Sequence, residues 1–298
     1  YGAGPSILLF ADALRSRERI AAAVVAAGGR LSVACPLEDA VTRIEQHAAP
    51  AGVVVELGSG SETLAERIFD TIERGAQNRR FRSVALIDNS LIDLAAARTL
   101  HADVDLLCGD DRGDLAAALG SLVAPRTMRL NDVSTEAGPH RLRELSEEVG
   151  RIARTLAALS NQSPEDQPIF RNGTADADDD GELIVDAPAL RAIIRARRLR
   201  DQFFTTEIFA DPAWDMLLDL MAARIEGQAV AVSSLCIAAA VPPTTALRWI
   251  KTMTDLGLFV RIADPNDRRR VFIELSPRAA TAMGAYLRAM RKVLPKSV

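Results

Sequence analysis

One stretch decides the fold of the C-terminal part of the chain: SSLCIAAAVPPTTALRWIKTMTDLGLFVRIADPNDRRRVFIEL, from Ser233 to Leu275. A short helix is predicted over residues 234–240, because Ser233 is a good N-cap and the two prolines after Val241 interrupt a helix. A second helix is predicted from Thr244 to Leu256. A short helix, a tight turn and a second helix form a helix-turn-helix, which is typical of DNA-binding domains.

The second helix separates apolar from polar side chains. Its predicted buried face consists of Ala246, Trp249, Ile250 and Met253. Its N-terminal half, which enters the major groove in such folds, carries Thr244, Thr245, Arg248 and Lys251 on the outer face. Threonine hydroxyls suit phosphates or base edges, and arginine suits guanine. We expect these four residues to contact DNA, together with Ser233 and Ser234 of the first helix.

A hairpin is predicted after the second helix. Its strands cover residues 259–262 and 271–275, and between them lie the turn 263–267 and three arginines, Arg268, Arg269 and Arg270. Other helices are predicted over residues 187–204, where arginines form a dense basic face, and over 213–226 and 278–292. A hairpin next to a helix-turn-helix is a wing. Residues 187–298 therefore predict a mainly α winged helix-turn-helix domain.

The stretch from Leu235 to Thr281 resembles the MarR-type winged-helix family. The resemblance rests on the helix-turn-helix and on the motifs DLGL (255–258), DPNDRRR (264–270) and LSPRA (275–279). It implies that Asp267 braces the wing and that Arg269 contacts the minor groove or the DNA backbone, assisted by Arg268 or Arg270. Typical members are single-domain dimers that sense a small ligand. The large N-terminal addition departs from that pattern and leaves the ligand and the dimer interface open.

Five strand–helix repeats are predicted in the first 125 residues. Continuous apolar runs such as GVVVEL (52–57) are typical of strands buried on both faces. The predicted strands are 6–11, 31–34, 52–57, 83–87 and 104–108, and the predicted helices are 17–27, 37–48, 63–77, 91–100 and 115–122. This alternation predicts the α/β class, with a parallel five-stranded sheet covered by helices on both faces.

The order of these elements resembles a response-regulator receiver domain, a flavodoxin-like fold, over residues 1–127. The resemblance implies a phosphorylation site, which is degenerate in this chain. Only Asp12 remains of the acidic pair that holds Mg²⁺, and Glu56 replaces the phosphoryl-accepting Asp. No hydroxyl stands directly at the end of the fourth strand, which runs into Asp88-Asn89-Ser90, and no Lys follows the fifth. Glu56 is one methylene too long for in-line transfer. We expect a pseudo-receiver, in which Glu56 is either a simple polar residue or a constitutive phosphate mimic.

The composition separates the two ends of the chain. The net charge of −4 combines 17 Lys and Arg against 10 Asp and Glu in residues 187–298 with 19 against 30 in residues 1–186. A basic C-terminal region suggests a polyanionic partner. Three scattered cysteines and three scattered histidines predict no disulfide, no metal site and no cofactor, in a reducing cytoplasm. No apolar run predicts a membrane span, and no nucleophile–base pair or phosphate loop predicts an enzyme.

Two segments are predicted to join the domains. Residues 130–160 predict a long connecting helix, and its apolar seam from Leu142 to Leu159 favours a homodimer, although the seam could pack onto its own chain instead. His140 opens this helix without the partner motif of a phosphorelay. Residues 161–186 contain prolines and an aspartate run, which predict an acidic flexible linker.

Together, these patterns leave the operator, target genes, sign of regulation and signal undefined, but they predict a class of protein. We expect a dimeric bacterial transcription regulator, located in the cytoplasm, that binds specific sequences of double-stranded DNA. Its non-phosphorylated receiver-like domain is expected to provide control, with a signalling protein as a possible partner. The alternative is a signalling scaffold whose pseudo-receiver and winged helix both dock proteins.

Overall fold

The computed structural model describes residues 4–60, 62–99, 103–109, 111–124, 186–203 and 210–293. The predicted connecting helix (130–160), His140 and all but the last residue of the predicted linker (161–186) lie outside these ranges. The described residues of 4–124 and of 186–293 belong to one compact unit. We call the described residues of 4–124 the sheet module and those of 186–293 the helical module.

The sheet module contains a five-stranded parallel sheet, as the sequence predicts. Its strands are β1 (Ser6–Phe10), β2 (Arg30–Cys35), β3 (Gly52–Leu57), β4 (Arg82–Ile87) and β5 (Val104–Cys108). Every neighbouring pair is parallel, and the order across the sheet is β2-β1-β3-β4-β5. The strands β2 and β5 therefore form the two edges of the sheet.

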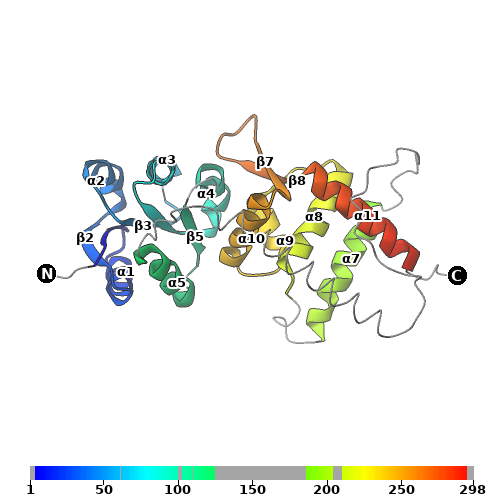
Figure 1. Ribbon diagram of the computed structural model, residues 1–298, viewed down its shortest axis with the longest axis horizontal. Helices are drawn as coiled ribbons and strands as arrows, with labels where there is room; N and C mark the ends of the chain where they lie inside the picture. The colour runs from blue at the N-terminus through cyan, green and yellow to red at the C-terminus, as the bar shows by residue number, and fades with distance from the viewer. Residues whose placement is uncertain are drawn as a thin grey trace, which may run out of the picture. The chain divides into compact units, whose positions relative to one another are not determined.

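Helices cover both faces of this sheet (Figure 1). They are α1 (Leu14–Ala26), α2 (Ala40–Gln46), α3 (Glu62–Gln77), α4 (Ile92–Thr99) and α5 (Arg112–Val123), with 3-10 turns η1 (Leu37–Asp39) and η2 (Asn89–Leu91). Successive strand residues point to opposite faces, so Val54 packs with α1 and α5, whereas Val53 and Val55 pack with the helices α2, α3 and α4. The uninterrupted apolar strands follow from this two-sided burial.

Helix starts differ most from the sequence prediction, and capping explains one of the differences. The predicted helix 115–122 begins at Arg112, because the Asp111 carboxylate accepts hydrogen bonds from the amides of Gly113 and Asp114. The predicted helix 37–48 is instead η1 followed by α2. The predicted helix 91–100 likewise divides into η2 and α4.

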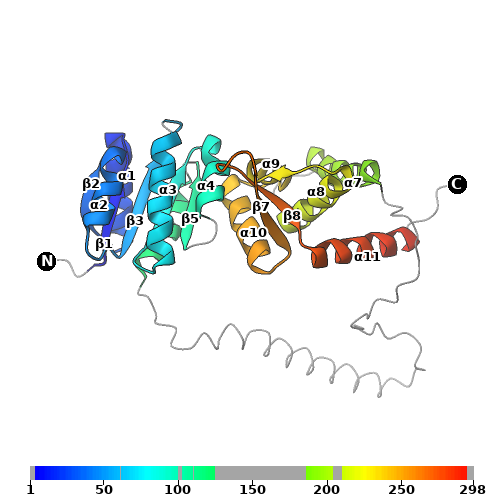
Figure 2. The ribbon, with the colours of Figure 1, turned by 90° about the horizontal axis from the view of Figure 1, so that it is seen from above.

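The helical module combines helices with a small antiparallel sheet (Figure 2). Its helices are α7 (Ala187–Leu199), α8 (Pro212–Glu226), α9 (Val232–Ala238), α10 (Pro243–Asp255) and α11 (Pro277–Val293), with a 3-10 turn η3 (Arg200–Gln202). Its strands are β6 (Val230–Ala231), β7 (Phe259–Ala263) and β8 (Val271–Leu275), in the order β6-β8-β7. Helix α8 supplies much of the core, and Gly227 ends it in the left-handed conformation at φ 65°.

The predicted helix-turn-helix corresponds to α9 and α10, followed by the β7–β8 hairpin. Ala240 turns the chain between the helices at φ 54°, and Pro243 is the first residue of α10. The predicted N-cap at Ser233 is wrong, because α9 begins at Val232 and Ala231 occupies the cap position. The physical reason lies in Ser233 itself, whose hydroxyl and amide both donate to the Asp93 carboxylate in the sheet module.

Candidate nucleic-acid interface

The residues predicted to contact DNA all lie in the helical module, on α9, on α10 and before β8. Their exposure differs. Ser234, Arg248, Arg268, Arg269 and Arg270 are exposed, whereas Ser233, Thr245 and Lys251 are partly buried. Thr244 is only 1% exposed. Most of the predicted set is therefore at least partly accessible, but the most N-terminal residue of that set on α10 is covered in this structure.

The hairpin turn is held by its own aspartates. Asp264 accepts hydrogen bonds from the amides of Asn266 and Asp267. Asp267 accepts from the Arg269 amide at 2.9 Å and from the Arg269 Nε at 3.2 Å. The first of these bonds, followed by the contact with the Arg269 side chain, lowers the pKa of Asp267. Asp267 therefore stays ionised and orients Arg269 at the hairpin tip.

Thr244 is covered by the sheet module. The Cys108 amide donates to the Thr244 Oγ1 at 2.9 Å, and the Thr244 hydroxyl donates back to the Cys108 carbonyl at 3.1 Å. Cys108 is the last residue of β5, the edge strand against which α10 packs. Both hydrogen bonds are buried, so the hydroxyl of Thr244 has no route to a DNA base in this arrangement.

Ser233 contacts the carboxylate of Asp93 on α4. The Ser233 hydroxyl donates to Oδ2 at 2.6 Å, and the Ser233 amide donates to Oδ1 at 2.9 Å. Charge-assisted hydrogen bonds of this kind are stronger than neutral ones. Phosphate oxygens of DNA accept the same two kinds of bond, from serine hydroxyls and from backbone amides. An anionic oxygen thus already occupies this donor pair.

Two predicted DNA-contacting arginines form ion pairs with the same module. Arg248 Nη1 lies 3.0 Å from Asp114 Oδ1 on α5. Arg269 Nη1 lies 2.8 Å from Glu62 Oε2, and its Nε lies 3.9 Å from Glu66 Oε1, both on α3. These pairs are half-exposed, so solvent screens them and they can exchange for other anions.

Arg261 of β7 is a contact that the sequence prediction missed. Its guanidinium donates to the carbonyl of Ala96 on α4 and also interacts with the buried Glu73 of α3. Burial lowers the pKa of Arg261, and Glu73 raises it. Burial likewise raises the pKa of Glu73, whereas Gln77 and then Arg261 and Lys251 lower it. Arg261 had no signal in the sequence beyond its place in a strand, because its partners are remote in the chain.

Two buried cysteines lie where the modules meet. Cys108 ends β5 and Cys236 lies on α9, and both thiols are free. Burial raises the pKa of Cys236 to about 12, with further contributions from Cys108 and Asp93. Burial, and then Asp88, raise the pKa of Cys108 to about 12. Cys35, on the opposite edge strand β2, is partly exposed. The three thiols therefore differ in their environment in a way that labelling can measure.

The arginines of α7 have a different set of partners, which lie within the helical module. Arg191 bonds to Asp219 and to Glu226 of α8, and Arg197 bonds to Asp215 at 2.7 Å. The basic face predicted for this helix is thus partly neutralised by the acidic face of α8. Exposed arginines of the helical module outside α7 include Arg248 on α10 and Arg268, Arg269 and Arg270 of the hairpin.

The degenerate receiver-like positions lie together at the carboxyl ends of β1, β3 and β4. Asp12 and Glu56 line one cavity of about 400 Å³. Asp12 accepts a hydrogen bond from the Leu37 amide at 2.9 Å, and Glu56 forms an ion pair with Arg19 of α1 at 2.7 Å. Asp88, on the same cavity, accepts from the amide and hydroxyl of Ser90, which lowers its pKa. Each of these carboxylates has a partner within the sheet module.

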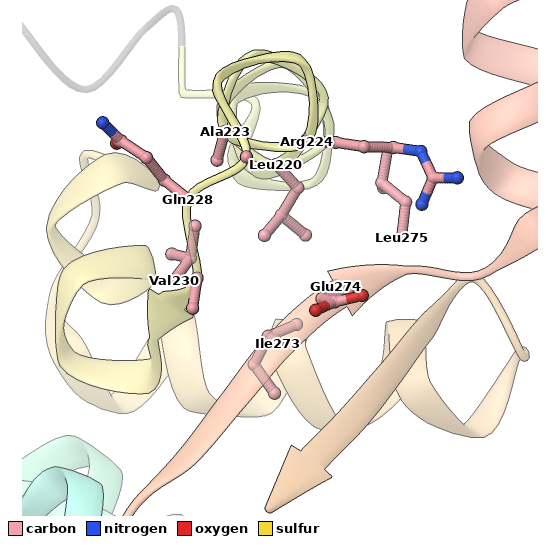
Figure 3. Close-up of a pocket in the computed structure, with 10 residues that line it drawn as sticks. Leu220, Ala223, Arg224, Gln228, Val230, Ile273, Glu274 and Leu275 are labelled. Carbon is pink, nitrogen blue, oxygen red and sulfur yellow. The ribbon is translucent and has the colours of Figure 1, made fainter. Parts of the chain in front are cut away.

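A second cavity, of about 430 Å³, lies within the helical module (Figure 3). It is bounded by the C-terminal end of α8, by β6 and by β8. Its lining combines apolar side chains such as Leu220, Val230 and Ile273 with the polar Gln228 and the charged Arg224 and Glu274. None of the residues predicted to contact DNA lines it. This cavity is therefore separate from the candidate nucleic-acid interface.

Two features are absent from the described residues. These residues contain no group of three or more His, Cys, Asp or Glu side chains arranged to hold a metal ion. Within the same ranges, every helix is too short or too polar to span a bilayer.

Comparisons with known proteins add only distant likenesses. No family model and no curated protein matches the chain. Among solved structures, Staphylococcus aureus MepR bound to ethidium bromide is similar at 16% identity and a TM-score of 0.26, covering 37% of this chain and 77% of that one. Bordetella bronchiseptica BpsR, described for regulation of DNA binding by 6-hydroxynicotinic acid, has 21% identity, coverage of 35% and 73%, and a TM-score of 0.23. The heme sensor PefR of Streptococcus agalactiae, in complex with heme, has 15% identity, coverage of 37% and 79%, and a TM-score of 0.24. TM-scores this low do not establish a shared fold.

Proposed function

We propose that this chain is a transcription regulator that binds double-stranded DNA through α10 and the β7–β8 hairpin. The observation that supports it most is the placement of Arg248 on α10 and of Arg268, Arg269 and Arg270 on the adjoining hairpin, in one module with a helix-turn-helix. A helix with outward polar residues fits the major groove, and a basic hairpin next to it fits the flanking backbone or minor groove.

The proposal includes the finer predictions from the sequence. The functional form is a homodimer, with residues 130–160 as its dimerisation helix and 161–186 as an acidic linker. The sheet module is a flavodoxin-like pseudo-receiver, which its strand order supports. Because Glu56 is paired with Arg19, we propose that this module does not use phosphoryl transfer. The protein acts in the cytoplasm without a cofactor and is not an enzyme.

The test is the salt dependence of binding to a fluorescein-labelled pool of mixed-sequence 30-base-pair duplexes, measured by anisotropy with the full chain. Lys and Arg contacts with phosphates release counterions, so affinity should fall steeply as salt rises, by about 10³-fold or more between 50 and 200 mM for six or more contacts. Replacing Arg268, Arg269 and Arg270 by Ala should weaken binding to every sequence. The matched control replaces Arg15, Arg43 and Arg67, three exposed arginines of the sheet module, and should have a much smaller effect.

The second candidate is a signalling scaffold whose winged helix docks protein. One observation favours it: Thr244, Ser233 and Arg248 already bond to protein groups, which are those of the sheet module of the same chain. A flat salt response, or equal effects of the two arginine triples, would support the scaffold and contradict DNA binding.

A further inference from the structure

Several residues proposed to bind DNA also bond to the sheet module, and they cannot do both at once. DNA binding by α9, α10 and the hairpin requires their outer side chains to reach phosphates and bases. In this structure four of those side chains bond to the sheet module: Ser233, Thr244, Arg248 and Arg269. We define the acidic face as Glu62 and Glu66 of α3, Asp93 of α4 and Asp114 of α5, the carboxylates that these contacts use.

We propose that this arrangement is a closed, autoinhibited state, in which the acidic face competes with DNA for the winged-helix surface. The inference rests on the proposed DNA-binding function and adds its regulation. Opening separates α10 from β5 and α9 from α4, and it frees the surface for DNA.

The first support for the proposal is that the sheet module covers the N-terminal turn of α10. Thr244 lies in the N-terminal turn of α10, the part of the helix that must enter the groove. It is 1% exposed and bonded to the backbone of the edge strand β5 in both directions. A duplex cannot reach a helix end that is buried under a strand, so bound DNA and this contact exclude each other.

The second support for the proposal is the negative charge of the acidic face. The acidic face presents carboxylates to the groups that would meet phosphates: Asp93 to the Ser233 hydroxyl and amide, Asp114 to Arg248, and Glu62 to Arg269. Carboxylate and phosphate oxygens accept the same bonds from these donors. The contact thus replaces the anions of DNA with anions of the chain itself.

The contact between the two modules also includes interactions that can exchange with solvent. The apolar cluster of the sheet module continues into the helical module, which stabilises the closed state. The arginine pairs are half-exposed, at 50% for the Arg248 side chain and 51% for Arg269, so water and salt compete for them. The closed state is held by an apolar contact, by the buried bonds of Thr244 and Arg261 and by exchangeable ion pairs, and a polyanion competes for the ion pairs.

The experiment neutralises three of the four carboxylates of the acidic face and leaves the side-chain size nearly unchanged. The lock variant is Glu62→Gln, Asp93→Asn and Asp114→Asn in the full chain. Its control carries the same change in net charge at three exposed positions of the same module: Glu18→Gln, Glu38→Gln and Asp103→Asn. Two readouts are taken: anisotropy with the mixed-sequence duplex pool, and the rates at which N-ethylmaleimide labels Cys108 and Cys236 relative to Cys35.

The lock variant should bind the duplexes about tenfold or more tightly than the control variant, because a larger fraction of the chain is open. Without DNA, it should also label faster at Cys108 and Cys236, with no change at Cys35. Equal affinity and equal labelling in the two variants would overturn the closed state. Faster labelling with no DNA binding in any variant would retain the closed contact and reject the DNA-binding function. Tight binding by both variants with no difference in labelling would retain the DNA-binding function and reject the closed contact.

Discussion

The sheet module carries two groups of carboxylates that are used in different ways. Asp12, Glu56 and Asp88 lie at the carboxyl ends of the strands, where the receiver-like pattern would place phosphorylation, and each bonds to a group of its own module. The acidic face bonds instead to the helical module. In our proposal, the acidic face controls the conformation of this protein, and the carboxylates at the strand ends do not.

The largest predicted effect is a loss of folding stability at high pH. The ordinary thiol pKa is 9.0, and burial raises the pKa of Cys108 and Cys236 to about 12 in the closed structure. The neutral thiols therefore stabilise the fold fully below pH 9, and this contribution is lost as pH rises from 9 towards 12. For Cys236 the loss is at most about 1.4 kcal/mol per pH unit.

Urea unfolding at pH 8, 9 and 10 measures this loss. A variant with Cys108→Ala and Cys236→Ala is the control, because it keeps every other titrating group. The free energy of unfolding of the parent chain should fall more than that of the variant as pH rises. Parallel losses in the two proteins would contradict the buried, neutral state of these thiols.

A smaller effect, on base preference, is expected at Arg248, the α10 residue that pairs with Asp114 of the acidic face. Arg248→Ala should relax base preference at one position of the bound sequence by about 1–3 kcal/mol, because arginine reads guanine through two hydrogen bonds. Selection from a randomised duplex library measures the preference. Arg43→Ala, an exposed arginine on α2, provides the control. A uniform loss of affinity with unchanged preference would assign Arg248 to the DNA backbone instead.

The smallest effect is expected at Glu56. Glu56→Gln removes the charge that pairs with Arg19 but touches nothing in the acidic face. DNA affinity should stay within about twofold of the parent, whereas Asp93→Asn should increase it. Labelling of Glu56 by acetyl phosphate, or an affinity change as large as that of Asp93→Asn, would show that the receiver-like pocket still provides control.

Local patterns in the sequence predict most of the elements of this fold. The apolar run of β3 is buried on both faces, as its composition indicates, and the prolines after Val241 mark the turn before α10. Asp12 and Glu56, which the receiver resemblance places at strand ends, line one cavity because the carboxyl ends of parallel strands meet at one edge. These predictions depend on neighbours in the chain or on the regular geometry of a sheet.

The contacts between the modules could not be predicted in this way. Asp93 and Ser233 are 140 residues apart, and Cys108 and Thr244 are 136 apart. The periodicity of a helix or a strand relates only residues that are a few positions apart, so it does not predict these contacts. The misplaced cap at Ser233 has the same origin, since a distant carboxylate accepts the bonds that a local cap would use. Polarity places Arg248 on the exposed face of α10, but it fails for Trp249, which is 37% exposed, and for Thr244, which the sheet module covers.

The most direct test of the central claim is labelling of the parent protein with and without saturating mixed-sequence duplex at low salt. The claim is that DNA and the acidic face exclude each other. The predicted result is that DNA speeds labelling of Cys108 relative to Cys35, because β5 is uncovered when α10 enters the groove. DNA binding that leaves the Cys108 rate unchanged, or lowers it, would contradict the account.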